Sequence, residues 1–411
     1  MKIVLQLEGW NIIDGASLQS RELIHYLAQY HDVHLFTWMD PDRIQDDPPE
    51  ESETFHYYLV QTINLKFILK NSGICHRVSI DSISMPKLLK NIKPDIIHIT
   101  TPLGAIFRTL LKYSKINHIP LVMSFSSDIS SYFNFLGFKF LNDFAISSID
   151  FYLRESYRHA TAIVVPSPFI GQKCQTLFQS TIIQSFEELD PQKYNQLLWI
   201  PYAIDTNIFH IAEKEKSQIK LQLCQEYQLD PSRQIVLWVS RIVPEKNPER
   251  WHRLMLQAIS YNYLIEAIAI GTGPLLIDFQ NESHPHIHWI GEVPNNNVAL
   301  WMQIADIFLF PSTVETFSNV IMESVACGCQ AIIAHEPNHF LLGDLQIETI
   351  EKNKYEYGWT INTDCDIDWF NAFDECYHNP ILNRTNRFIE NHYSRDIIYS
   401  DYNMLYQKLV S

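Results

Sequence analysis

Short apolar runs alternate along the chain with longer stretches whose apolar residues recur at helical spacing. An apolar run of about four to eight residues is typical of a buried strand, and a repeat of about 3.6 residues is typical of an amphipathic helix. In the first half, a helix is predicted at residues 17–30. The strands predicted there are residues 2–7, 33–38, 96–100, 121–125 and 162–165. This order predicts βαβ units around a parallel sheet.

The same alternation begins again after residue 205. The strands predicted in this second half are residues 235–239, 267–270, 287–290, 307–310 and 331–334. Residues 207–231 are polar and carry no strand pattern, whereas residues 388–409 at the end have apolar positions at helical spacing. Two open α/β domains in tandem are therefore expected, and such sheets bind ligands at the carboxyl ends of their strands.

Composition excludes several classes of protein. The chain has 411 residues, of which 46% are hydrophobic and 19% charged, so a largely disordered protein is excluded. Its net charge of −16 disfavours a nucleic-acid-binding protein that grips phosphates. The chain has no apolar run of about 18 residues, so no membrane span is expected. Its first apolar run is too short, and an acidic residue follows it too soon, for a signal peptide to be expected. Seven cysteines without a CxxC pair predict neither a disulfide framework nor a zinc site, so the expected location is the cytoplasm.

Two segments admit two interpretations each. Residues 66–93 hold six basic residues and one acidic residue, which gives a local charge of +5. They form either a surface for anionic lipid headgroups at the inner face of the membrane or an ordinary solvated helix face. The aromatic residues of 132–144 form either a contact for an acceptor or a membrane, or ordinary packing.

The segment 307–334 is the most informative one for chemistry. Its strand ends at a Pro-Ser pair, Glu315 lies in the following loop, and Glu323 lies inside the helix that starts near residues 317–319. The backbone N–H groups at this helix start belong to Thr316, Phe317 and Ser318. A helix N-terminus favours a phosphate, and carboxylates on either side can accept hydrogen bonds from sugar hydroxyls. The other interpretation is that Glu315 caps the helix and that Glu323 is a helix residue that faces solvent.

A pair of cations follows the first strand of the second domain. Arg241 stands directly after the strand, and Lys246 follows five residues later across a proline-containing loop. Cations at the carboxyl end of a parallel strand can neutralise a departing pyrophosphate. The other interpretation is that Arg241 and Lys246 are ordinary surface cations on a loop.

These segments, in this order, resemble the retaining glycosyltransferases of family 4, and the resemblance covers essentially the whole chain. The motifs that match are the cation pair Arg241 and Lys246, the Gly-x-Gly-Pro turn at 271–274, the strand end Gly291-Glu292-Val293, the paired Glu315 and Glu323, and Gly328. The resemblance implies the GT-B fold, an α/β architecture of two Rossmann-like, doubly wound domains facing each other across a cleft. Residues 1–205 would bind the acceptor, residues 206–390 the nucleotide sugar, and residues 391–411 would form a helix returning to the first domain.

The resemblance also implies roles for single residues. Glu315 and the amides after it would hold the donor sugar and the distal phosphate, and Glu323 the ribose. The loop of residues 8–16 would close over the phosphates from the first domain. The catalytic residues implied are Glu315, Arg241, Lys246, Ser126 and Asp128. The donor-binding residues implied are Gly15, Ala16, Gly273, Val293, Thr316, Phe317, Ser318, Asn319 and Glu323. Retention by front-face attack, without a protein nucleophile, a metal or a cofactor other than the co-substrate, is the expected mechanism.

The chain departs from the family pattern at four places. Ala16 replaces the second glycine of a Gly-Gly pair, Ser318 replaces a glycine after Phe317, and residues 201–205 read PYAID where the family has Pro-Asn-Gly-x-Asp. Most seriously, Ser126 stands where lipid-glycosylating relatives have a histidine near the reacting carbon. A donor sugar of different shape, a neighbouring residue acting instead, or donor binding without catalysis would each explain Ser126.

The function implied is transfer of a sugar from a nucleotide sugar to a hydroxyl acceptor, which is a glycan, a lipid or a small molecule. Two alternatives remain: a catalytically silent sugar-nucleotide-binding subunit, and a phosphorylase or epimerase of the same fold. The alternating His284, His286 and His288 would share one face of a strand. No carboxylate or thiol ligand set adjoins them in the sequence, so they are not expected to bind a metal.

Overall fold

The computed structural model divides the chain into two compact units, Met1–Ala203 with Asp396–Ser411, and Ile204–Arg395. The residues it describes are 1–10, 15–40, 50–64, 77–80, 84–126, 142–282, 284–335, 354–355, 358–362, 364–380 and 386–411. Several residues singled out from the sequence lie outside these ranges: loop residues 11–14, Lys66, Lys70, Asp128 and residues 132–141.

The first unit contains an eight-stranded sheet in the order β3-β2-β1-β6-β7-β8-β10-β9. All neighbouring strands in it run parallel. The strands are β1 (Lys2–Leu7), β2 (Asp32–Thr37), β3 (Phe55–Leu59), β6 (Ile96–Ile99), β7 (Leu121–Ser124), β8 (Ala162–Val165), β9 (Thr181–Ile182) and β10 (Gln196–Trp199). A separate antiparallel pair is formed by β4 (Thr62–Asn64) and β5 (Arg77–Ser79).

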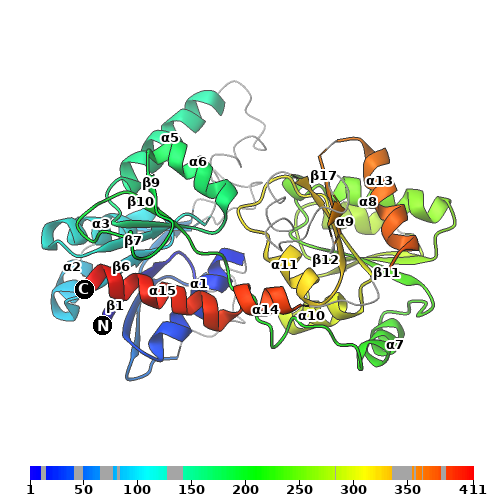
Figure 1. Cartoon of the computed structure of the whole chain (residues 1–411), viewed down its shortest axis with the longest axis horizontal. Coiled ribbons are helices and arrows are strands. Elements are labelled where there is room, and N and C mark those ends of the chain that lie inside the picture. Colours follow the sequence, from blue (N-terminus) through cyan, green and yellow to red (C-terminus); the bar gives the residue numbers. More distant parts are fainter. Residues whose placement is uncertain are drawn as a thin grey trace. The chain divides into compact units, whose positions relative to one another are not determined.

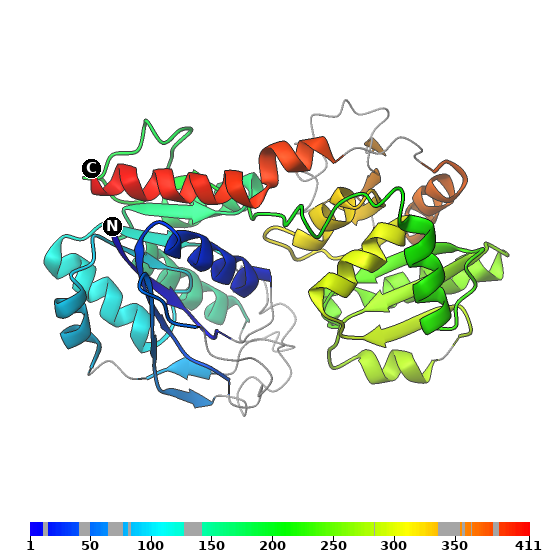
Figure 2. The same ribbon diagram turned by 90° about the horizontal axis from the view of Figure 1, so that it is seen from below.

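Helices cover both faces of this sheet, because successive side chains of a strand point to opposite faces. One face packs against α1 (Gly15–Ala28) and α15 (Arg395–Val410), which lie side by side in Figure 2. The other face packs against α2 (Met85–Ile92), α3 (Gly104–Asn117), α5 (Asn142–Tyr157) and α6 (Pro168–Phe178). The last helix of the chain thus completes the core of the unit that holds the first strand (Figure 1).

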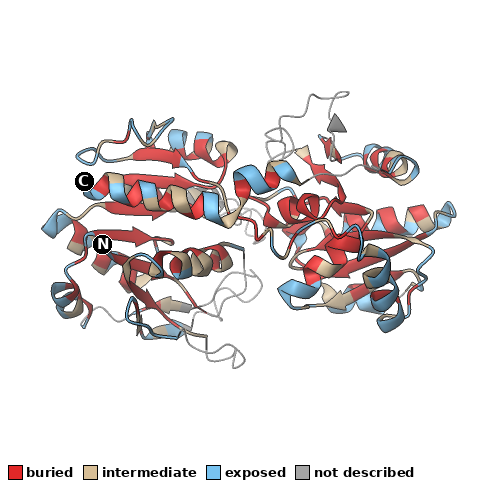
Figure 3. Ribbon diagram, turned by 60° about the horizontal axis from the view of Figure 1, so that its bottom comes forward, coloured by how far each residue is buried: buried red, intermediate tan, exposed pale blue. Residues whose placement is uncertain are grey.

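The second unit contains a seven-stranded sheet in the order β13-β12-β11-β14-β15-β17-β16, parallel except for β16. The strands are β11 (Gln234–Val239), β12 (Ile265–Ile270), β13 (Ile287–Gly291), β14 (Ile307–Phe310), β15 (Gln330–Ala334), β16 (Lys354–Tyr355) and β17 (Gly358–Ile361). The helices are α7 (Lys216–Glu226), the 3-10 turn η2 (Pro244–Lys246), α8 (Pro248–Ser260), α9 (Leu276–Asn281), α10 (Asn295–Ile304), α11 (Asn319–Ala326), α13 (Asp366–His378) and α14 (Arg387–Tyr393). Strands β11, β12, β14 and β15 are almost wholly buried, as Figure 3 shows.

The strands predicted from the sequence are all present, each within two residues of its predicted bounds. The sequence pattern missed β3, β4, β5, β9, β10, β16 and β17. β9 is only two residues long, and β3 reads FHYYL, which has neither the apolar run nor a clean alternation. Among the described residues, no helix is long and apolar enough to span a membrane.

Candidate functional site

The cation after β11 and the carboxylate after β14 meet at the carboxyl edge of the second sheet. These strands are direct neighbours in the sheet. Nζ of Lys246 donates a hydrogen bond of 2.6 Å to Oε1 of Glu315 and one of 3.3 Å to the carbonyl oxygen of Val314. The side chains of Lys246 and Glu315 are only 10% and 11% exposed. Little water therefore screens this ion pair, so the attraction between the two charges is strong.

Arg241, the other predicted cation, lies five residues before Lys246 in the same loop. Its Nη2 atom is 3.5 Å from Oε1 of Glu245, whose side chain is buried. Glu245 was not singled out from the sequence, where it reads as one more polar residue of a proline-containing loop. Its position beneath Arg241 holds that guanidinium at the strand end.

The start of α11 carries buried polar atoms. Ser318 occupies the N-cap position but makes no capping hydrogen bond with its side chain. Oγ of Ser318 and Oδ1 of Asn319 are buried without a hydrogen-bond partner in the part of the chain that the structure describes. A buried polar atom left without a partner costs free energy, so such atoms indicate a place where a ligand supplies the partner. The positive end of the helix dipole favours an anion there.

Glu323 lies one turn further along α11 and is only 8% exposed. The interpretation of Glu323 as a solvent-facing helix residue is therefore wrong, because α11 turns this position inward. Of the other predicted donor residues, Phe317 is buried and packs against Tyr393, and Thr316 is half-buried.

The glycine turn at 271–274 is required by a close approach of two backbones. Gly271 has φ +140°, and a Cβ there would lie 1.8 Å from the carbonyl oxygen of Ser240. A Cβ on Gly273 would lie 2.3 Å from the carbonyl oxygen of Ile242. The turn thus packs directly under the loop that carries Arg241, and no residue with a side chain fits there. Val293, which follows β13, is half-buried.

The predicted residues of the first unit are placed at the starts and ends of its elements. Gly15 and Ala16 begin α1, and the carbonyl oxygen of Ala16 accepts a hydrogen bond from the hydroxyl of Ser20. Ser126 follows β7 and is half-buried. It lines a cavity of this unit together with His98, Thr100, Ser124 and Tyr402, among others.

His98 is a residue of this cavity that the sequence analysis missed. It is fully buried on β6, with Nε2 2.8 Å from the hydroxyl of Ser124 and Nδ1 hydrogen-bonded to the hydroxyl of Tyr406. Burial lowers the pKa of His98 to about 3, so its imidazole is neutral. The signal in the sequence was one histidine inside the apolar run IIHI. A histidine therefore lines the same cavity as Ser126, although it comes from a different strand.

Glu8, at the start of the loop expected to close over the phosphates, is held inside the first unit. Its carboxylate accepts hydrogen bonds from Trp38 Nε1 at 2.6 Å, Gln6 at 3.1 Å and Ser79 at 3.3 Å. Burial raises the pKa of Glu8 in spite of these bonds. It is therefore anchored to its own sheet.

The alternating histidines do have a carboxylate neighbour, which corrects the expectation from the sequence. Nδ1 of His286 lies 3.0 Å and Nε2 of His288 lies 2.8 Å from the two carboxylate oxygens of Glu266. Burial acts to raise the pKa of Glu266, but hydrogen bonds from His288, the backbone of Asp230 and His286 outweigh it and lower that pKa. Glu266 comes from the neighbouring strand β12, so its approach is invisible in the sequence around the histidines.

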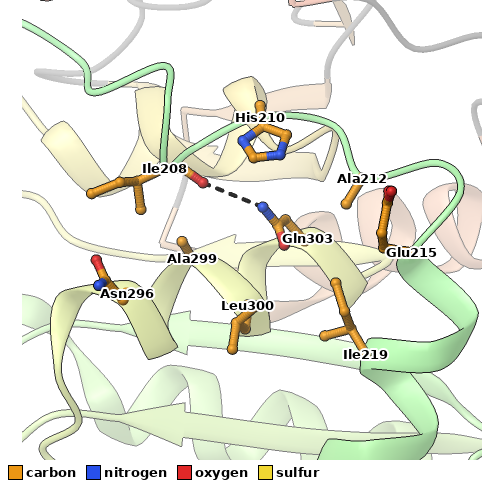
Figure 4. Close-up of a pocket in the computed structure, with 9 residues that line it drawn as sticks. All are labelled: Ile208, His210, Ala212, Glu215, Ile219, Asn296, Ala299, Leu300 and Gln303. Carbon is orange, nitrogen blue, oxygen red and sulfur yellow. Dashed lines mark hydrogen bonds between the residues drawn. The ribbon is translucent and has the colours of Figure 1, made fainter.

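Another cavity lies in the second unit and contains none of the predicted residues (Figure 4). It lies between α7, α10 and the segment before α7. Its lining residues are Ile208, His210, Ala212, Glu215, Ile219, Asn296, Ala299, Leu300 and Gln303. Gln303 donates a hydrogen bond of 3.3 Å across it to the carbonyl oxygen of Ile208. This cavity is thus separate from the charged edge of the sheet.

Comparison with known proteins identifies the family. The family model "Glycosyltransferase Family 4" matches residues 13–181, and "Glycosyl transferases group 1" matches residues 233–341. The chain is 24% identical over 255 residues to sulfoquinovosyl transferase SQD2 of Arabidopsis thaliana, covering 61% of this chain and 45% of that protein. It is 30% identical over 98 residues to the GPI3 subunit of the phosphatidylinositol N-acetylglucosaminyltransferase of Saccharomyces cerevisiae. This match covers 23% of this chain and 22% of that protein. The chain thus matches these two relatives over less than half of their length.

Solved structures extend the similarity over the whole chain. Sucrose-phosphate synthase of Thermosynechococcus elongatus has a TM-score of 0.71 at 15% identity, with 99% of this chain and 98% of that one covered. Anabaena HepE, solved with UDP and glucose, has a TM-score of 0.65 at 17% identity, with 98% of each chain covered. At such identities the likeness establishes the fold. With its two parallel sheets wrapped by helices and both family models matched in order, the chain has the GT-B fold and belongs to the group 1 glycosyltransferases of family 4.

Proposed function

We propose that this chain transfers a sugar from a nucleotide-sugar donor to a hydroxyl acceptor, with retention of configuration. The observation that carries the proposal is the desolvated pair of Lys246 and Glu315 in the same unit as the start of α11, where Ser318 and Asn319 present buried polar atoms. An anion with several oxygens and hydroxyl donors would satisfy these groups together, and a sugar diphosphate has both.

The donor would rearrange the charges of the site. Its diphosphate would take Lys246 from Glu315, and Glu315 would then accept hydrogen bonds from sugar hydroxyls. Arg241 would add a second cation to the leaving diphosphate, in the fork geometry that guanidinium offers to phosphate. Glu323, buried on α11, would accept from ribose hydroxyls. The cations act most strongly when the bond to the sugar breaks, because the leaving group gains negative charge at that point.

The acceptor would bind the first unit. In a front-face reaction the acceptor hydroxyl attacks from the side of the leaving diphosphate, whose oxygen takes the proton, so no protein nucleophile is needed. The rate would come from orientation and leaving-group stabilisation. Exposed Lys87, Lys90 and Lys93 on and after α2 support an anionic membrane as the place where a lipid acceptor would be met, and the chain would act in the cytoplasm or at the inner membrane face.

Thermal unfolding with a panel of nucleotide sugars tests donor binding. A donor at about 100 times its Kd adds about 2.7 kcal/mol, which should raise the midpoint by several degrees. Arg241→Ala should remove most of the shift. The matched control is Arg253→Ala, which removes an exposed arginine of α8 that pairs with Asp366. No shift with any donor, or an equal shift in Arg241→Ala, would contradict the site.

Ser126 favours one second candidate function, a sugar-nucleotide-binding subunit without transfer activity. A donor that binds without transfer to any acceptor, together with activity gained by Ser126→His, would establish that candidate. Transfer by the unaltered chain would exclude it. Conversion of the donor sugar without an acceptor, or turnover that requires phosphate, would instead identify an epimerase or a phosphorylase.

A further inference from the structure

Three side chains of the first unit converge at the amino end of β2. Asp32 and His34 are two residues apart on this strand and so share one face of the sheet. The parallel register pairs His34 with His56 of β3, so the second imidazole stands beside the first. The two rings are stacked with centroids 4.9 Å apart.

The ligating atoms of these side chains point to a common place. Oδ1 of Asp32 is 3.1 Å from Nε2 of His34 and 3.5 Å from Nε2 of His56. All three atoms lie within 4.8 Å of one another. Asp32 Oδ1 and His34 Nε2 are buried atoms, yet no hydrogen bond of acceptable geometry satisfies either of them within the described residues. Because these two atoms face each other without a hydrogen bond between them, both can bind the same third atom.

We propose that Asp32, His34 and His56 bind a divalent transition-metal ion. Zinc binds imidazole nitrogen and carboxylate oxygen at about 2.0–2.2 Å, so two ligands of one tetrahedral ion lie roughly 3.4 Å apart. The distances of 3.1 and 3.5 Å fit that spacing. Two imidazoles and one carboxylate select zinc, cobalt, nickel or ferrous iron over magnesium and calcium, which prefer oxygen ligands.

The surroundings complete the site. The hydroxyl of Tyr58 lies 3.1 Å from Nδ1 of His34, and a partner on the second ring nitrogen is what fixes a metal-binding imidazole. The side chain of His34 is 9% exposed, whereas those of Asp32 and His56 are 35% exposed. The ion therefore has an approach from solvent, and water can fill its remaining coordination positions.

The site has a structural role rather than a part in sugar transfer. β3 pairs only with β2 among the described strands and forms the edge of the sheet. A metal held by both strands ties this edge strand to the sheet and to the start of β2. The cluster of Glu266, His286 and His288 is different, because each histidine there already has its own carboxylate oxygen as a hydrogen-bond partner.

Zinc titration of the tag-free chain by calorimetry tests the proposal, with cobalt absorption as a second readout. The expected result is one zinc ion per chain, with a rise in the unfolding midpoint when zinc is present. His56→Gln and Asp32→Asn should each weaken this binding more than about tenfold, since even outer partners of a metal site contribute about that much. The control His392→Gln changes an exposed histidine of α14 and should leave binding unchanged.

Folding of each variant is checked by circular dichroism, and both substituted side chains are partly exposed, so the fold should tolerate the changes. If one variant does not fold, the other decides. Absence of zinc binding by the unaltered chain would overturn the proposal. So would binding that both variants retain, or binding that is lost in His286→Gln instead.

Discussion

At the residue scale, burial decides the chemistry of single side chains. His98 lies inside the first unit with both ring nitrogens in hydrogen bonds, and burial lowers its pKa to about 3. Lys246 and Glu315 form an ion pair whose two side chains are almost wholly buried. None of these environments can be read from the identity of the residue.

His98 predicts a loss of stability on mild acidification. Its folded pKa of about 3 lies below the ordinary value of 6.5, so the unfolded chain binds the proton first as pH falls. The stabilisation is complete above pH 6.5 and is lost progressively towards pH 3. Between pH 7 and pH 5 this amounts to about 2 kcal/mol.

Urea unfolding at pH 7 and pH 5 measures the effect. His98→Gln should show a smaller difference between the two pH values than the unaltered chain, whatever its absolute stability. The exposed His392→Gln should keep the full difference. An equal pH dependence in His98→Gln would show that this imidazole is protonated in the folded state.

At the element scale, the last helix is part of the first unit although it follows the second in sequence. The buried positions of α15 include Ile398, Tyr402, Leu405 and Leu409, and they pack against the face of the sheet that α1 also covers. Tyr399 donates a hydrogen bond of 3.0 Å to Glu22 of α1. The helical spacing of the tail predicted the element, and the contacts show which core it completes.

Leu405→Ala should destabilise the first unit by about 2–5 kcal/mol, because it leaves a cavity at a fully buried position. Met404→Ala is the matched control on the same helix, at an exposed position, and should change stability by less than about 0.5 kcal/mol. Chemical denaturation followed by tryptophan fluorescence would measure both. Equal effects of the two substitutions would mean that α15 does not dock on the sheet.

At the scale of the whole molecule, the chain consists of two compact units. The proposed donor residues around Lys246, Glu315 and α11 belong to Ile204–Arg395, whereas Ser126 and the proposed metal ligands belong to the other unit. Ligands of the two sites should therefore stabilise different parts of the chain.

Hydrogen exchange with a nucleoside diphosphate tests this division. The probe is the diphosphate that gives the largest thermal shift. Amide protection should rise at residues 241–246, 271–274 and 315–323, while α15 and the strands β2 and β3 stay unchanged. Zinc should give the reverse pattern, with protection rising around Asp32 and His56. Nucleotide-dependent protection confined to the first unit would contradict the assignment of the donor site.

The sequence predicted the regular elements well for a physical reason. A strand buried on both faces of a parallel sheet must be apolar along its length, as in β8 and β14, so a local pattern reveals it. Edge elements are less constrained, which is why β3 and β9 were missed. The motif residues around Glu315 were recognisable because the loop and the helix start that carry them are contiguous in sequence.

By itself, the sequence determined the alternation of strands and helices, the position of the charged residues at strand ends, and the family. Only the tertiary structure decided which of those residues meet. Lys246 reaches Glu315 because β11 and β14 are adjacent, His56 reaches His34 through the register of β2 and β3, and Glu266 reaches two histidines of the next strand. Such contacts depend on strand order and register, which the packing of the whole sheet sets, and no local pattern of residues encodes them.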